Sequence, residues 1–360
     1  MPTQLPHPAP PPLSKIKKGS RSSDGSRPQK PKIPPTFSLG LSLILLCEIL
    51  LFSDALTRPG SKVMKTDAQV VQLLAHPPSN LYFAIARFVA VNMTPLVWPA
   101  YILLLDGLLS FPPNQKLKIK NQKSPLRLRP HHFALLCLAS VSIWSLFDAI
   151  NFYFMGRAWN YIGMPGDLSL LSRLDRYWGY FLAFASIVPA MLLSGQVFLN
   201  LGLFDWARSP AWRMPRYAKW IALLAGVTMF LWPLMGQNPI ANLTLWTSLV
   251  FLLDPINQKL GRPSMFRDWQ NGWYGRTLAA FTGGLVCGLL WEFWNYWALA
   301  KWIYRLDFLG PLERIKYFEM PLPGLLGFLP FGLECWVMWQ TIRILLDGLA
   351  ESLPDDRTLI

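Results

Sequence analysis

An acid and an asparagine stand three residues apart inside apolar segments of this chain, and the pair occurs twice. The two pairs are Glu292 with Asn295 and Asp148 with Asn151. Residues three apart lie on one face of a helix, so each asparagine can orient its neighbouring carboxyl group or hold a substrate oxygen. Acids are costly in apolar surroundings, so a repeated acid favours function. The alternative is that each acid only hydrogen-bonds across a helix bundle.

Glu292 has the surroundings expected of a general acid. Trp291 and Trp294 flank it, and a carboxyl group among indoles retains its proton more readily than one in water. A proton retained near neutral pH is what general acid catalysis requires. Trp291, Trp294, Trp302 and Tyr304 are candidates to line a substrate pocket, although most tryptophans of such a chain are expected in a belt at the membrane interface.

The acid pairs belong to a longer internal repeat. Trp98 precedes Asp106 by eight residues, and Trp246 precedes Asp254 by the same spacing. The matching positions of the two parts are 148, 144, 143 and 141 residues apart, and Pro189 matches Pro330. A nearly constant offset indicates an internal duplication. Residues 36–204 and 205–348 are therefore predicted to be two repeats.

Glu334 breaks the correspondence between the repeats. It lies four residues after Pro330, whereas the matching position in the first repeat is Leu193. This difference predicts that the second repeat carries the reactive site, where Glu292 and Glu334 would face one cavity. The catalytic candidates are therefore Glu292, Glu334 and Asp148. Pro189 and Pro330 are predicted to interrupt the starts of two helices.

The composition predicts a membrane protein. Of the 360 residues, 52% are hydrophobic and 15% are charged, against about 25% charged in soluble domains. Several apolar runs reach the roughly 20 residues that a membrane span needs. The fold class is therefore all-α, a polytopic bundle of two parallel four-helix repeats. The predicted spans are about 36–56, 81–110, 131–156, 177–203, 217–237, 239–257, 277–300 and 320–347.

The distribution of charge predicts the orientation in the membrane. The net charge of +14 comes from basic residues in tails and loops, so nucleic acid is not an expected partner. The basic segments 111–130, 204–219 and 258–276 place both termini in the cytoplasm of a bacterial inner membrane. Residues 1–35 and 349–360 are predicted to be cytoplasmic tails, the first one disordered and able to touch anionic lipid. Two longer connections, 57–80 and 301–319, are placed at the outer interface.

The sequence contains no pattern typical of a cofactor or metal site. No P-loop, HExxH or dinucleotide fingerprint occurs in a suitable context. The four cysteines fall within predicted spans, and the four histidines lie in the tail, in loops or at a span edge. No cofactor and no metal are therefore predicted, and the expected partners are membrane lipid and an apolar small molecule.

Two resemblances follow from the second repeat. The segments Trp291–Trp297, Lys301–Tyr304 and Phe318–Glu334 resemble an uncharacterised family of bacterial multi-pass membrane proteins. Trp291-Glu292, Trp302-Ile-Tyr304 and Pro330 with Glu334 also resemble the membrane carotenoid cyclases of the lycopene-cyclase type. Those cyclases carry adjacent acids two or three residues after the proline, whereas this chain has one acid, four residues after it. The second resemblance implies redox-neutral, acid-initiated chemistry on an isoprenoid.

Three functions remain open at this point. An enzyme acting on a lipid or isoprenoid predicts an apolar pocket near Glu292 and Glu334. A proton-coupled or small-solute transporter predicts a polar path to both faces, with Asp148 and Glu292 near the axis between the repeats. A membrane scaffold predicts acids that pair with other groups and no cavity.

Overall fold

The computed structural model describes residues 33–111, 130–166, 170–236, 238–347 and 358–360. Residues Ile33–Ile360 form one compact unit. The predicted tail at 1–32, the basic loop at 112–129 and residues 348–357 of the predicted second tail lie outside the described residues.

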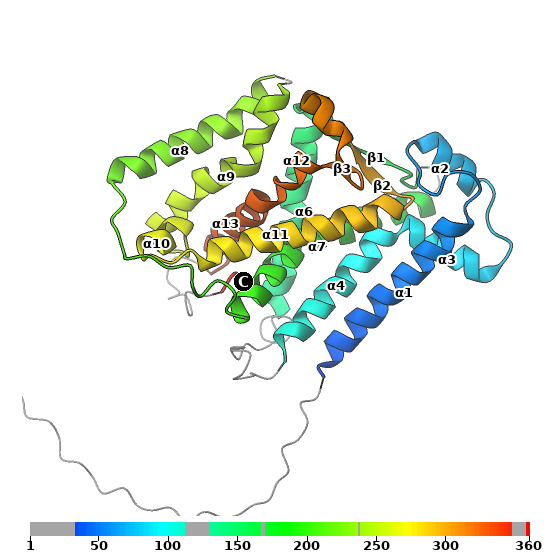
Figure 1. The fold of residues 1–360 in the computed structure, drawn as a ribbon, viewed down its shortest axis with the longest axis horizontal. Helices are drawn as coiled ribbons and strands as arrows, with labels where there is room; N and C mark the ends of the chain where they lie inside the picture. The colour runs from blue at the N-terminus through cyan, green and yellow to red at the C-terminus, as the bar shows by residue number, and fades with distance from the viewer. Residues whose placement is uncertain (1–32, 112–129, 167–169, 237, 348–357) are drawn as a thin grey trace, which may run out of the picture. The chain divides into compact units, whose positions relative to one another are not determined.

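Long apolar helices make up most of the described chain (Figure 1). Seven of them are long and apolar enough to cross a membrane, and a bent pair makes eight if it counts as one span. The protein is thus an all-α polytopic membrane bundle, as predicted. The long helices are α1 (Pro35–Thr57), α3 (Leu81–Val91), α4 (Met93–Leu109), α6 (Pro130–Tyr153), α7 (Leu170–Asn200), α8 (Arg216–Leu231), α9 (Pro239–Lys259), α11 (Gly275–Trp297) and α13 (Phe328–Asp347).

Short elements connect these helices and include two small sheets that the sequence did not predict. Strands β1 (Trp159–Ile162) and β2 (Lys301–Tyr304) pair with each other, as do β3 (Lys316–Tyr317) and β4 (Met320–Pro321). The remaining short elements are α2 (Asp67–Leu74), α10 (Met265–Gln270), α12 (Leu322–Leu325) and the 3₁₀ helices Trp232–Met235 and Asp307–Arg314.

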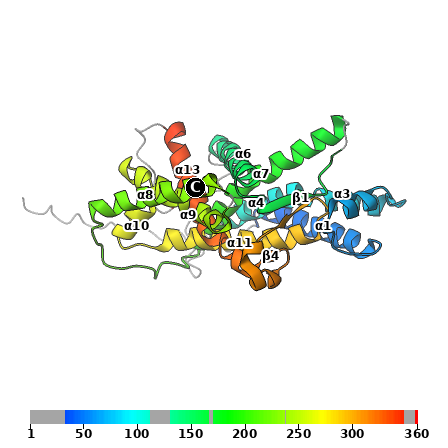
Figure 2. The same ribbon diagram turned by 90° about the horizontal axis from the view of Figure 1, so that it is seen from above.

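The long helices pack in pairs along the chain. Helix α1 packs on α4 as α8 packs on α9, and α6 packs on α7 as α11 packs on α13. In Figures 1 and 2, α1 and α3 lie at one end, and α8, α9 and α10 lie at the other. Glycines permit two of these contacts: a side chain at Gly40 would collide with the backbone at Leu104, and one at Gly226 with that at Leu252.

The span predicted at 81–110 is broken, because α3 and α4 meet at a bend of 80°. Asn92 ends α3: its backbone and side-chain amides both donate to the carbonyl of Phe88, at 2.9 and 3.2 Å. Pro95 has no N–H to continue the hydrogen-bond ladder across the bend. The carbonyl of Ala90, left free by the break, accepts the N–H of Leu299 at 2.8 Å. The bend therefore joins α3 to the segment that follows α11.

Pro189 does not interrupt the start of a helix, because α7 continues through it. Ser140 of α6 repairs the ladder just before the proline. Its hydroxyl donates to the carbonyl of Phe184 at 2.5 Å and accepts the N–H of Val188 at 3.0 Å. Pro330 is the third residue of α13 and does lie at a helix start, as predicted.

The last three residues do not form a free tail. Leu359 is fully buried, and its N–H donates to the side-chain oxygen of Gln196 at 2.7 Å. Its side chain lies against Gly195 of α7. Residues 358–360 of the predicted tail therefore lie against α7, where the apolar Leu359 finds a buried site.

Candidate functional site

The antiparallel pair β1–β2 organises the candidate site. Trp159 lies opposite Tyr304, and Tyr161 lies opposite Trp302. Each strand therefore presents the motif Trp-x-Tyr, in which the two aromatic side chains share one face. Trp302 and Tyr304 were predicted as candidates to line a pocket, and they line a cavity together with Trp159 and Tyr161.

The two asparagines of the acid pairs fix the strands to their helices. Asn151 donates to the carbonyl of Trp159 at 2.9 Å and accepts its N–H at 3.3 Å. Asn295 does the same to Trp302, at 2.8 and 3.0 Å. Asn295 is completely buried. Both amides are thus engaged by the backbone, and neither asparagine lines the cavity that Trp159 and Trp302 line.

The two acids hydrogen-bond the tyrosines of the strands. Asp148 accepts the phenol of Tyr161 at 2.9 Å and the indole of Trp159 at 2.8 Å. Glu292, which is completely buried, accepts the phenol of Tyr304 at 2.7 Å. The Tyr304 oxygen in turn accepts the indole N–H of Trp302 at 2.8 Å. Each acid therefore reaches the cavity through a tyrosine.

Both phenols keep their protons across the physiological range. Burial raises the pKa of Tyr304 well above 10, and the neighbouring Glu292 raises it further. Burial likewise raises the pKa of Tyr161, with Asp148 as the neighbouring acid. These tyrosines are hydrogen-bond donors rather than phenolates.

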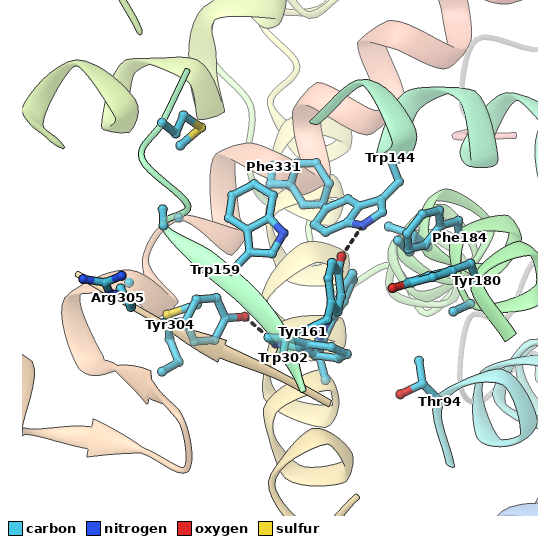
Figure 3. A pocket seen from close by; sticks show the side chains of 18 of the residues that line it. Thr94, Trp144, Trp159, Tyr161, Tyr180, Phe184, Trp302, Tyr304, Arg305 and Phe331 are labelled. Atoms are coloured by element: carbon cyan, nitrogen blue, oxygen red, sulfur yellow. Dashed lines mark hydrogen bonds between the residues drawn. The ribbon is translucent and has the colours of Figure 1, made fainter. Parts of the chain in front are cut away.

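The cavity has a volume of about 410 Å³, within the range of small-molecule sites. Figure 3 shows aromatic side chains of β1, β2, α6 and α13 around one space. The part of the chain before α8 contributes Trp98, Trp144, Trp159, Tyr161, Tyr180 and Phe184. The part from α8 onward contributes Trp246, Trp291, Trp302, Tyr304, Phe328 and Phe331.

The structure separates the predicted site residues into two groups. Trp291, Trp302 and Tyr304 line the cavity. Glu292, Glu334 and Trp294 do not, so the prediction that the two glutamates face one cavity is wrong. The physical reason is that Glu292 bonds Tyr304, which stands between it and the cavity.

The remaining predicted residues lie around this cavity. Glu334 is completely buried on α13 and accepts the N–H of Leu249 from α9 at 2.9 Å. Trp294 donates its indole N–H to Glu48 of α1 at 2.9 Å. Asp148 and Asn151 line a second hollow, whose lining shares Trp159, Tyr161 and Tyr180 with the cavity. The sequence thus identified the acids, but Glu292 and Glu334 do not point into the cavity.

A buried ion pair next to Glu292 was not predicted. Lys301, with no exposed side-chain surface, donates to Glu319 at 2.5 Å, and the half-exposed Lys65 donates to the same carboxylate at 2.6 Å. Burial lowers the pKa of Lys301 to about 8, although Glu319 opposes the change. Burial alone would raise the pKa of Glu319, but Lys301 and Lys65 lower it overall.

Several lining residues were also missed. Trp159 and Tyr161 precede Trp302 and Tyr304 by 143 residues, the offset of the repeat, but they were not among the predicted site residues. Trp98 and Trp246 served only as markers of the repeat. The sequence contained a signal for these residues. Aromatic residues that recur at nearly the same offset as the acid pairs are expected to belong to the same repeated structure. Phe331 and its neighbours carry no such signal, since phenylalanine is common in any apolar helix.

The fold and the site define a polytopic helical membrane protein with an aromatic cavity lined in part by a two-stranded ribbon. Comparison of the chain with protein-family models, curated proteins and solved structures finds no match. Among the described residues, no group of three histidine, cysteine or acidic side chains could hold a metal ion.

Proposed function

We propose that this protein is a membrane-embedded enzyme that binds a lipid or isoprenoid in the aromatic cavity and acts on it by acid–base chemistry. The observation that carries the proposal is the pair formed by Tyr304 and Glu292. The phenol lies in the cavity lining, and a completely buried carboxyl group lies within 2.7 Å behind it. Such an arrangement suits proton transfer to an apolar molecule in a site that excludes water.

The proposed step passes one proton through two groups. Glu292, in its protonated form, gives its proton to the oxygen of Tyr304 as the phenol proton moves to a carbon–carbon double bond of the ligand. The resulting cation lies among the π faces of Trp291 and Trp302, which favour positive charge. Loss of a proton from an adjacent carbon restores the pair, so the net reaction is a redox-neutral rearrangement. The resemblance to the carotenoid cyclases supports an isoprenoid as the substrate.

The proposal includes an origin of the chain by duplication. The two asparagines bond their strands in the same way, and the register of β1–β2 is symmetric, since each tryptophan faces the tyrosine of the other strand. The cavity takes Trp98 from one part and Trp246 from the other. A pseudo-twofold axis through the ribbon accounts for these matches. The second repeat differs by carrying Lys301, where the first has Ala158.

The proposed location is a bacterial inner membrane with both termini in the cytoplasm. The support is the positive charge of the loops that connect the helices away from the ribbon. In this orientation β1 and β2 lie at the outer surface, so a lipid of the outer leaflet would reach the cavity first.

The test begins with the occupant of the cavity. Gly179 of α7 lines the cavity, and a Cβ atom there would meet only Pro95, at 3.9 Å. Gly179→Leu should therefore fill the cavity without disturbing the fold. Gly236→Leu is the matched control, because nothing lies within 4 Å of its side-chain position. Mass spectrometry of organic extracts should show an isoprenoid or lipid bound to the wild type and to Gly236→Leu, and a reduced amount in Gly179→Leu.

The second stage tests chemistry. The extracted compound is returned to purified protein, and its conversion is followed by chromatography. Wild-type protein should yield an isomer of equal mass, whereas Glu292→Gln and Tyr304→Phe should bind the compound and convert it at least about a hundredfold more slowly. Equal conversion by Glu292→Gln would exclude the acid–base role. A compound that the wild type leaves unchanged but carries across liposomes would favour the transporter.

A further inference from the structure

The cavity contains two guanidinium groups that the proposed acid–base step does not use. Arg176 of α7 and Arg305, which directly follows Tyr304, belong to the lining together with Asp175. The described lining therefore has an excess of one positive charge. Arg305 is anchored through its backbone, because its N–H donates to the carbonyl of Ala158 at 2.8 Å. Its side chain is free to meet a ligand, and Figure 3 shows it at the edge of the aromatic group.

These two arginines differ from other arginines near the same ends of the helices. Arg58 and Arg87 both bind Asp54. Among the residues that the structure describes, neither Arg176 nor Arg305 has an ion pair or a side-chain hydrogen bond. A guanidinium at a cavity edge with no partner carries a strong, unused preference for a carboxylate or phosphate.

The position of the charges matches the shape of an amphiphile. The aromatic wall of the cavity, including Trp98, Trp291 and Phe331, is buried, whereas Arg305 is exposed and Arg176 is partly exposed. Both arginines lie at the end of the bundle that carries β1 and β2. A charged headgroup is most stable at the membrane interface, and an apolar chain is most stable among the buried aromatic rings.

We propose that the ligand of the cavity is an amphiphile with an anionic headgroup, a phosphate or carboxylate held by Arg305 and Arg176, and an apolar tail among the aromatic rings. This inference rests on the proposed function, since it assumes that the cavity is the binding site. It also places the chemistry: with the headgroup at Arg305, the first carbons of the tail lie next to Tyr304. The reacting double bond is then the one closest to the headgroup.

The experiment compares three probes with the same tail. Farnesyl monophosphate, farnesol and farnesylamine carry an anionic, a neutral and a cationic head, and they compete for the purified full-length protein in detergent, with bound masses read by native mass spectrometry. Wild-type protein should prefer the phosphate over the alcohol by on the order of tenfold or more, and the alcohol over the amine. Inorganic phosphate at the same concentration should not displace farnesol, because the tail supplies most of the affinity.

Variants separate this inference from the proposed function. Arg305→Gln combined with Arg176→Gln should reduce the preference for phosphate over alcohol at least fivefold while farnesol still binds, whereas Arg213→Gln, an exposed arginine outside the cavity, should change nothing. Equal binding of phosphate and alcohol to the wild type, or an unchanged preference in the double variant, would overturn the inference but leave the cavity as the binding site. If Gly179→Leu binds all three probes like the wild type, the cavity is not the site and both proposals fall.

Discussion

Tyr304 and Tyr161 line the cavity, whereas the acids that they bond, Glu292 and Asp148, do not, and this changes the chemical role of the acids. Glu292 is completely buried, with one oxygen on Tyr304 and the other, Oε2, without a hydrogen-bond partner among the described residues. An acid so placed does not touch the ligand. In the proposed step it supplies a proton to the oxygen of Tyr304, and the tyrosine is the group that would meet the ligand.

Asn295 should be a structural residue whose loss is costly. Its side chain satisfies both the N–H and the carbonyl of Trp302, and each group left unpaired in a buried place costs about 1–3 kcal/mol. Asn295→Ala should therefore lower the free energy of unfolding by about 2–4 kcal/mol, measured by thermal unfolding in detergent. Asn160→Ala, at a partly exposed site on β1, is the control and should cost less than about 1 kcal/mol. Similar losses for both variants would contradict the assigned role.

Lys301 should make stability depend on alkaline pH. Its pKa is about 8 in the folded protein, against an ordinary value of 10.5. Between these values the unfolded chain holds a proton that the folded protein has lost, so the free energy of unfolding rises with pH. This gain in the free energy of unfolding from Lys301 is absent below about pH 8, where both states hold the proton. It is complete above 10.5, where neither state binds the proton.

The measurement compares unfolding of the wild type and Lys301→Met from pH 7 to 10.5. The wild type should gain stability relative to the variant across this window, while Lys316→Met, which removes an exposed lysine, should keep the slope of the wild type. Parallel curves for the wild type and Lys301→Met would show that Lys301 titrates normally. Glu319→Gln should move the window to lower pH, because Glu319 is the group that raises the pKa of Lys301.

At the scale of elements, the sequence predicted the helices well and their interruptions poorly. Each predicted span overlaps an observed helix, or the bent pair at 81–110, because runs of apolar residues report directly on membrane crossing; the starts of α7 and α13 differ most from the prediction. The bend at Asn92 was missed because it depends on a distant residue. The N–H of Leu299, more than 200 residues away, donates to the carbonyl of Ala90 that the bend leaves free. The ribbon was missed for a similar reason: four-residue strands are stable here only because asparagines from helices hold them.

Gly163, directly after β1, tests how tightly the ribbon is packed. Its φ is +67°, and a side chain there would collide with the carbonyl of Leu299. Gly60 has a φ of +70° with nothing within 4 Å, so it carries the backbone strain without the collision. Gly60→Ala should lower stability by about 1–2 kcal/mol, and Gly163→Ala by a further 1–3 kcal/mol or so. Equal losses in thermal unfolding would mean that Gly163 has room.

For the whole molecule, the candidate site was predictable only in part. The acid–asparagine pairs lie beside β1 and β2, whose aromatic residues line the cavity. The reactive site was predicted in the second repeat, whereas both parts of the chain line the cavity. The direction of each side chain could not be predicted, because a helix position does not say whether a neighbouring strand will cover it.

The orientation in the membrane gives a prediction for the molecule as a whole. Ser61 lies between α1 and α2 on the side of the ribbon, and Ala211 lies between α7 and α8; both are exposed. In a background without the four native cysteines, Ser61→Cys should react with a membrane-impermeant maleimide in intact cells. Ala211→Cys should react only after lysis. The reverse pattern would place the termini outside, and reaction of both in intact cells would contradict the span count.

The central claim is that an apolar molecule occupies the aromatic cavity, and photolabelling tests it most directly. A farnesol analogue with a diazirine in its tail is irradiated with the purified protein, and labelled peptides are sequenced. The label is expected on cavity residues such as Trp246, Phe328 and Phe331, with loss of labelling in Gly179→Leu and in excess farnesol. Label confined to exposed residues of α8 such as Trp220 and Leu224, unchanged in Gly179→Leu, would show that the molecule binds only the lipid-facing surface.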